Sequence, residues 1–498
     1  MSKKLPIFYN ALLLTGVNLV LRLVSTAFQV YLSGRIGAAG IGLLQLVLSV
    51  GGLALTAGMA GIRTATMYLT AEELGKRRPE NVRWVLSGCM LYSLLCSGLI
   101  ALVLFFLAPG IAVKWIGESG VTGVVRLFAF FLPVNCLTGV MVGYFTAANQ
   151  IGTLAAVEVA EQVCTMGMTI VSLHFFSDGD PVRACAIVVM GSGMGGCFTL
   201  LCLLYLRSRE KALTGTPISV RHRLLKTAVP LALADDLKSG ISTAENLMVP
   251  KRLALYRTIA DPLAAFGMVC GMVFPILMFP AAILFGLAEL LIPELARCNA
   301  AGSQNRIHYL AKRSLRIAML YGCFFCGLMY LLSDRLCILL YDSADAGVYL
   351  QRFAILVPML YCDAITDAMI KGLGQQTACV RYNILTSGLD VLFLFLLLPR
   401  YGMGGYFFSF LVTHLINFLL SLRRLVKITG LRLNYKKAVL SLLCAAIAVL
   451  ICTLCTGSIA KGLLYIPAFF ALLLLFGVLK KGDFLWLKKL ISNKKEGV

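Results

Sequence analysis

The chain has 498 residues, of which 59% are hydrophobic and only 14% are charged, and its mean hydropathy is +0.87. This composition excludes an ordinary soluble globular protein, in which about half of the residues are apolar. The net charge of +22 would suggest nucleic-acid binding in a soluble protein. Here the basic residues gather in short breaks between apolar segments, which favours a membrane protein resting against anionic lipid, with no nucleic-acid partner.

Apolar segments follow one another along almost the whole chain. Each covers about 20 residues, the helical length that spans a hydrocarbon core about 30 Å thick. The runs are continuous rather than alternating, which favours helices over a β-barrel. We predict about 14 transmembrane helices, near residues 9–32, 41–66, 84–108, 123–146, 154–176, 184–206, 224–248, 263–287, 314–332, 350–370, 378–398, 404–422, 437–456 and 462–479.

Two polar breaks divide these segments into groups. The break at about 207–223 follows six segments, and six more precede a basic linker at 423–437. We therefore predict an all-α polytopic membrane protein in three parts: an N-lobe at 1–212, a C-lobe at 213–430, and a C-terminal helix pair with a basic tail at 431–498.

A weak internal repeat at an offset of 225 residues supports two equivalent lobes. Pro133 and Gln150, around the fourth segment, correspond to Pro358 and Gln375 around the tenth. A repeat with an even number of helices gives two lobes of the same orientation, with substrate bound between them near the midplane of the bilayer. The sequence thus predicts transport by alternating access.

The distribution of basic residues predicts the orientation of the chain. If the N-terminus is cytoplasmic, the cytoplasmic pieces hold 31 of the 45 Lys and Arg residues. Cytoplasmic loops carry such an excess in membrane proteins generally. We therefore expect both termini on the cytoplasmic side.

Polar side chains recur at helical spacing inside several apolar segments. Residues at i, i+3, i+4 and i+7 share one face of a helix, and a polar face avoids lipid. Such faces occur in the first, second and seventh segments, so we predict a cavity where they meet. Its predicted substrate-binding residues are Asn18, Arg22, Gln29, Arg63, Lys238 and Glu245.

Carboxylates outnumber cations inside the apolar segments, which indicates coupling of transport to H⁺ or Na⁺. The predicted ion-coupling residues are Glu158, Glu161, Asp235, Asp363, Asp367 and Asp390. Purely structural roles remain open for some of these charges. Asp235 and Asp367 are spaced to pair with Lys238 and Lys371 on their own helices, and Arg63 lies near a helix end, from which it can reach the interface.

The sequence contains no Walker motif, HExxH or nucleophile elbow. Two CxxC spacings, Cys323/Cys326 and Cys452/Cys455, lie inside apolar segments, where small packing residues are the favoured interpretation. The glycine-rich run 191–196 also lies inside an apolar segment, and it predicts close helix packing rather than a phosphate loop. We therefore expect no enzyme activity, no catalytic or metal-binding residues and no cofactor.

Several short motifs together resemble the stage V sporulation protein B family, in the polysaccharide-exporter branch of the multidrug/oligosaccharidyl-lipid/polysaccharide (MOP) exporters. The clearest is Gly143-Tyr144-Phe145, followed 18 residues after the glycine by Glu161-Gln162. The other matches are Arg22 ahead of Gly37 and Gly40-Ile41-Gly42, Ala71-Glu72 after the second segment, and the spaced pairs Pro230/Glu245 and Pro280/Pro293.

This resemblance implies a V-shaped, MATE-like fold and a place in peptidoglycan or other polysaccharide biosynthesis, or in sporulation. The implied protein is a flippase of the bacterial cytoplasmic membrane whose substrate is a lipid-linked saccharide on a polyprenyl diphosphate. The family often has arginine where this chain has Thr165 and Asp235, and commonly proline at Thr153. Two cations that could hold a diphosphate are therefore missing. We expect a monomer surrounded by membrane lipids.

Three functions compete at this stage. A flippase uses cations such as Arg22, Arg63 and Lys238 to hold a diphosphate. A cation-coupled multidrug or organic-cation antiporter of the same superfamily uses the excess of intramembrane acids. A membrane-embedded transferase needs a longer extramembrane domain than the loops provide. The resemblance favours the flippase.

Overall fold

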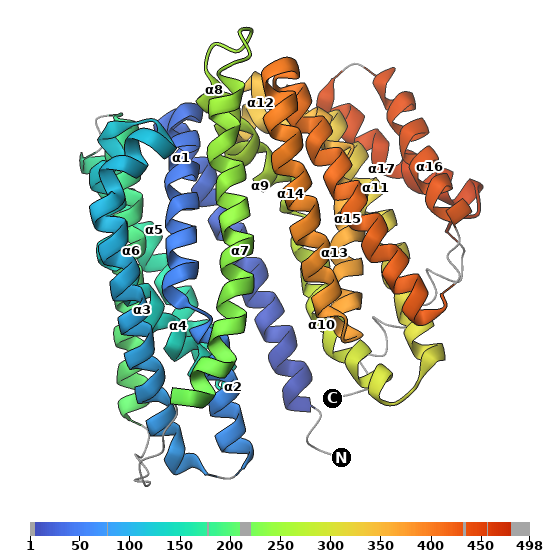
Figure 1. The fold of residues 1–498 in the computed structure, drawn as a ribbon. Coiled ribbons are helices and arrows are strands. Elements are labelled where there is room, and N and C mark those ends of the chain that lie inside the picture. Colours follow the sequence, from blue (N-terminus) through green and yellow to red (C-terminus); the bar gives the residue numbers. More distant parts are fainter. Residues whose placement is uncertain are drawn as a thin grey trace. The chain divides into compact units, whose positions relative to one another are not determined.

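The computed structural model describes residues 5–76, 78–176, 179–209, 221–431, 435–455 and 457–479, and the regular structure in these ranges is helical (Figure 1). Within them, ten helices are long and apolar enough to cross a membrane, or up to twelve if each of two bent pairs is one crossing. The predicted all-α polytopic fold is confirmed. The number fourteen stays a prediction.

The longer helices alternate with short ones and with brief π-helical and 3₁₀ turns. In chain order they are α1 (Leu5–Met59), α2 (Ile62–Gly75), η1 (Pro79–Asn81), α3 (Val82–Gly110), η2 (Ile111–Ile116), η3 (Ser119–Val121), α4 (Thr122–Ala147), α5 (Ile151–Phe176), α6 (Pro181–Ser208), α7 (Arg221–Leu253), α8 (Pro262–Gly267), η4 (Met268–Val273), α9 (Phe274–Met278), α10 (Ala281–Ala300), α11 (Gln304–Tyr341), α12 (Ala344–Ala354), α13 (Val357–Gly372), α14 (Gln376–Tyr401), α15 (Met403–Thr429), α16 (Tyr435–Thr453) and α17 (Ser458–Leu475).

The chain packs into two compact units. Unit 1 comprises Met1–Gly271 and Ser387–Tyr406, and unit 2 comprises Met272–Thr386 and Phe407–Val498. By this division α7 packs with the N-terminal helices and lies beside α1 (Figure 1). The predicted three-part division at residues 212 and 430 stays a prediction.

In unit 1, the first two predicted segments join without a polar loop. Gly37 has φ 68° and ψ 179°, a conformation that turns the chain inside α1 and that glycine alone adopts readily. A second break follows at Ala60 and Gly61, whose φ angles are 44° and 71°. The predicted segment 41–66 is therefore wrong at its end, because the helix stops at Met59 and α2 starts at Ile62.

The glycine-rich run of α6 packs closely against α5 and α4, as predicted. A Cβ on Gly195 would lie 2.0 Å from Oγ1 of Thr165, and one on Gly196 would lie 2.3 Å from Oδ1 of Asn135. Small residues let neighbouring helix backbones approach in this way inside membranes. The packing interpretation is confirmed.

In unit 2, two of the predicted segments are broken helices. The segment predicted at 263–287 is interrupted at Phe279 and Pro280, where the axis bends by 63°, and the segment predicted at 350–370 is α12 and α13, bent by 57°. Proline lacks the N–H that would continue the helical ladder. Two tyrosine hydroxyls bond carbonyls beside this bend: Tyr321 donates to the Pro280 oxygen at 2.9 Å, and Tyr361 donates to the Leu277 oxygen at 2.7 Å.

The close packing of α6 leads to a stability prediction. Gly195→Val should lower the free energy of unfolding by about 1–3 kcal/mol, the usual cost of overpacking a close contact. The matched control is Gly167→Val on α5, where nothing lies within 4 Å of the added Cβ. Thermal unfolding of both variants in detergent, followed by size-exclusion chromatography, provides the comparison. Equal melting temperatures would contradict the close approach of α6 and α5.

Candidate functional site

A polar cavity of about 530 Å³ lies within unit 1, between the second half of α1, the start of α2 and the middle of α7. This volume is in the range of small-molecule sites. The described lining residues are Ser49, Gly52, Leu55, Thr56, Met59, Gly61, Arg63, Thr64, Asp235, Lys238, Ser239, Ser242, Thr243 and Asn246. Most of them carry hydroxyl, amide or charged groups.

Hydrogen bonds between α1 and α7 form the wall of this cavity. Thr243 Oγ1 donates to the Ser49 carbonyl at 3.0 Å, and Asn246 Nδ2 donates to Ser49 Oγ at the same distance. Further along, Thr56 Oγ1 lies 3.3 Å from Ser239 Oγ. α1 and α7 are therefore in contact through hydroxyl and amide side chains.

Three predicted charges line the cavity together: Arg63 from α2, and Asp235 and Lys238 one turn apart on α7. All three side chains are exposed. Gly143 of α4 approaches the backbone of Arg63 so closely that a Cβ there would lie 2.5 Å from the Arg63 carbonyl oxygen. The glycine of the Gly143-Tyr144-Phe145 motif thereby lets α4 pack closely against α2 beside Arg63.

Two predicted acids of α5 do not line the cavity. Glu158 is half-buried and interacts electrostatically with Arg63 and Glu161. Glu161 accepts a hydrogen bond from Thr199 Oγ1 of α6 at 2.6 Å. The Glu161-Gln162 motif also reaches the first segment, because Gln162 Nε2 lies 3.4 Å from Ser25 Oγ.

The predicted residues of the first segment do not line this cavity. Arg22 is half-buried on α1, and its carbonyl accepts a hydrogen bond from Thr26. Gln29 donates from Nε2 to the Gly271 carbonyl at 3.2 Å. The side chain of Asn18 lies outside the described residues.

Two predicted residues from distant parts of the chain form a carboxyl pair in unit 1. Glu245 of α7 is hydrogen-bonded to Asp390 of α14, which is 7% exposed. Cys270 Sγ and Tyr406 Oη, 3.7 Å apart, belong to the same surroundings, since both interact with Glu245.

The other two predicted acids lie in unit 2, between α13 and α15. Asn417 Nδ2 lies 3.1 and 3.3 Å from the two carboxylate oxygens of Asp363. Ser421 Oγ donates to Asp367 at 3.0 Å, and Cys379 Sγ lies 3.2 Å from the same carboxylate. Both acids are therefore supplied with donors by a neighbouring helix.

Several residues of these sites were missed in the sequence analysis. The largest missed group is a face of buried hydroxyl and amide side chains on α15, spaced four residues apart: Ser409, Thr413, Asn417 and Ser421. Polar residues four apart share one face of a helix, so this spacing could have predicted a polar face on α15. Thr243 and Asn246 of α7 were also missed, because they flank the charged Glu245 rather than continue the spacing of the charged residues.

Comparisons with known proteins agree with this architecture. The MatE family model matches residues 15–171. "Stage V sporulation protein B" of Bacillus subtilis (strain 168) is 21% identical over 410 residues, which cover 79% of this chain and 78% of that protein. The structure of the lipid II flippase MurJ in an inward closed conformation has a TM-score of 0.66 at 12% identity, covering 93% of this chain and 98% of that one. An inward-facing multidrug resistance MATE family transporter of the MOP superfamily has a TM-score of 0.61 at 18% identity, covering 84% and 99%.

These likenesses define the fold: the chain is a multi-pass membrane protein whose helices are arranged as in structures of MATE family transporters and of MurJ. More narrowly, the resemblance to stage V sporulation protein B that the sequence motifs predicted is confirmed.

The polar cavity can be tested by its access to water. In a background without native cysteines, Ser242→Cys, which lines the cavity, should react with a charged thiol reagent at least about tenfold faster than Leu237→Cys, because the reactive thiolate is disfavoured in apolar surroundings. Leu237 is 51% exposed on the same helix and is not among the lining residues. Reaction at equal rates would contradict a hydrated cavity at α7.

Proposed function

We propose that the chain is a flippase that moves a lipid-linked oligosaccharide or peptidoglycan precursor, carried on a polyprenyl diphosphate, across the cytoplasmic membrane of a bacterium. The observation that carries this proposal is the pair of cations, Arg63 and Lys238, in a cavity otherwise rich in hydroxyl and amide groups. Arginine can hold a phosphate oxygen pair bidentately, and lysine acts as a point charge. The hydroxyls and Asn246 match the hydrogen-bonding groups of a sugar.

Similarity to known transporters also supports the flippase proposal. Stage V sporulation protein B and the lipid II flippase MurJ are both among the proteins that the chain resembles. We further propose that both termini face the cytoplasm, that two lobes alternate access to the substrate, and that the protein acts as a monomer. Arg22, Gln29 and Asn18 are proposed to contact substrate at another stage of the transport cycle.

A second function is favoured by a different observation. Asp235 lines the same cavity as the two cations, and Glu245 and Asp390 bring two carboxyl groups together in unit 1. An organic cation exchanged for H⁺ or Na⁺ would use these acids. The alternative proposal is therefore a cation-coupled antiporter of the same superfamily, with Glu158, Glu161, Asp363 and Asp367 as further candidates for ion coupling.

The flippase proposal predicts the effect of removing the cations. Arg63→Gln and Lys238→Gln should each reduce binding of the diphosphate about tenfold or more, because a hydrogen bond to a charged group contributes about 1.5–3 kcal/mol. Arg63→Lys should restore activity only in part, since the bidentate geometry is lost. The measurement is flipping of a labelled polyprenyl-diphosphate sugar in proteoliposomes.

The control for this experiment is Arg83→Gln, an exposed cation on α3 that does not line the cavity. Unchanged flipping in both cavity variants would contradict the flippase. If Asp235→Asn also abolished uptake of an organic cation in the same vesicles, the antiporter proposal would replace the flippase proposal.

The carboxyl pair predicts the dependence of transport on ion gradients. Glu245→Gln preserves the shape and hydrogen bonding of the side chain but removes a group that can bind a proton or Na⁺. Transport by this variant, and by Asp390→Asn, should no longer respond to an imposed pH or sodium gradient. The matched control is Glu289→Gln, an exposed acid on α10. Normal gradient dependence in both pair variants would exclude the pair from coupling and point to Asp363 or Asp367.

A further inference from the structure

Unit 2 contains two neighbouring cavities that the proposed transport does not use. The first has a volume of about 880 Å³ and is lined chiefly by α11, α15 and α16. The second has a volume of about 770 Å³ and is lined chiefly by α11 and α17. Lys312 and Arg316 of α11 line both of them, so these two cations stand where the cavities adjoin.

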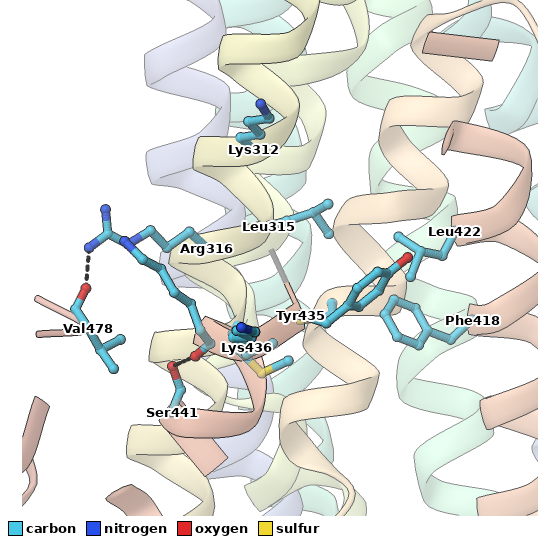
Figure 2. A pocket seen from close by; sticks show the side chains of 13 residues that line it. Lys312, Leu315, Arg316, Phe418, Leu422, Tyr435, Lys436, Ser441 and Val478 are labelled. Carbon is cyan, nitrogen blue, oxygen red and sulfur yellow. Dashed lines mark hydrogen bonds between the residues drawn. The ribbon is translucent and has the colours of Figure 1, made fainter. Parts of the chain in front are cut away.

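The first cavity is basic. Lys436 and Lys437, in the first turn of α16, line it together with Lys312 and Arg316. Figure 2 shows Lys312, Arg316 and Lys436. No acidic side chain is among the described residues that line either cavity. Four cations in one cavity favour an anionic occupant, and basic pockets between transmembrane helices bind the headgroups of anionic lipids.

Hydrogen bonds support the part of the first cavity that carries the cations. Arg316 donates from Nη2 to the carbonyl oxygen of Val478 at 2.5 Å, which anchors its guanidinium beside the end of α17 (Figure 2). Ser441 Oγ donates to the Lys437 carbonyl at 2.8 Å within α16. A planar guanidinium anchored through one nitrogen is oriented in advance for a phosphate group.

The second cavity is aromatic and apolar. Phe324 lies eight residues beyond Arg316 on α11, about 12 Å further along the helix axis. Its ring centroid lies 6.1 and 5.9 Å from those of Phe469 and Phe470 of α17. Cations therefore precede aromatic rings along a single helix, which is the order of groups that an amphiphile with an anionic head and an apolar chain requires.

We propose that the two cavities together bind an anionic membrane phospholipid, with its phosphate against Lys312 and Arg316 and an acyl chain along α11 toward Phe324 and Phe470. A zwitterionic lipid carries its own ammonium group, which four neighbouring cations disfavour. The chain's own C-terminal segment, 480–498, is also disfavoured by charge, since it contains six lysines and two acids. This site is separate from the polar cavity and does not depend on the transported substrate.

Native mass spectrometry of the full-length protein in detergent tests the proposal, with phosphatidylglycerol and phosphatidylethanolamine of identical acyl chains. Phosphatidylglycerol should bind more tightly. The double variant Lys312→Gln/Arg316→Gln should weaken its binding about 30-fold, or about fivefold for each cation removed. Arg335→Gln, an exposed cation further along α11 that lines neither cavity, should have no effect.

Other variants keep the test decisive. If the double variant fails to elute as a single species, Lys436→Gln/Lys437→Gln at the start of α16 replaces it with the same expectation. Phe470→Ala, at a 39% exposed ring, should weaken binding of long-chain but not of short-chain phosphatidylglycerol. Equal affinity for the two headgroups, or unchanged binding in the cation variants, would overturn the proposal. So would tighter binding of a polyprenyl phosphate, which would assign the cavities to the transported lipid.

Discussion

The structure depends on one constraint: inside the hydrocarbon region, every backbone amide and carbonyl must find a partner within the protein. Helices meet this requirement along their length. Where a helix stops, backbone groups lose their partners, and leaving them without hydrogen bonds costs free energy. In unit 2 the hydroxyls of Tyr321 and Tyr361 donate to backbone carbonyl oxygens beside the break at Pro280. A break with such side-chain partners is part of the architecture rather than a defect.

The same constraint governs the polar cavity of unit 1. Ser49 and Thr56 each donate to the carbonyl four residues earlier on α1, a bond that keeps a hydroxyl satisfied without any ligand. Their oxygens can still accept, and Ser49 does so from Asn246. The cavity walls are therefore stable when nothing is bound, while the exposed charges of Arg63, Asp235 and Lys238 remain directed to whatever enters.

Much of this fold could be predicted from the sequence because hydrophobic length and helical spacing are local properties. The apolar segments, the packing of the glycine-rich run in α6 and the polar faces of α1 and α7 all follow from residues close together in the chain. The break at Ala60 and Gly61 could not be predicted, since two small residues in an apolar run look like a continuing helix.

The candidate sites were harder to predict, because they join residues that are distant in the sequence. Glu245 was predicted to bind substrate and Asp390 to couple an ion, but nothing local indicated that they pair. Asp363 and Asp367 were likewise identified without their donors on α15. The placement of Arg63 was also open, because a cation near a helix end can reach the interface as readily as a cavity. Only the tertiary packing of α2 against α4 and α7 distinguishes these two roles.

Gly37 shows how a single backbone angle can restrict variation of the chain. Its pair of angles, φ 68° and ψ 179°, lies in a region that side-chain-bearing residues essentially do not occupy. No Cβ contact prevents substitution there, since nothing lies within 4 Å of the position that a Cβ would take. The restriction is conformational and not steric crowding by neighbours. Among homologues that keep this turn, position 37 should therefore stay glycine even where the residues around it diverge.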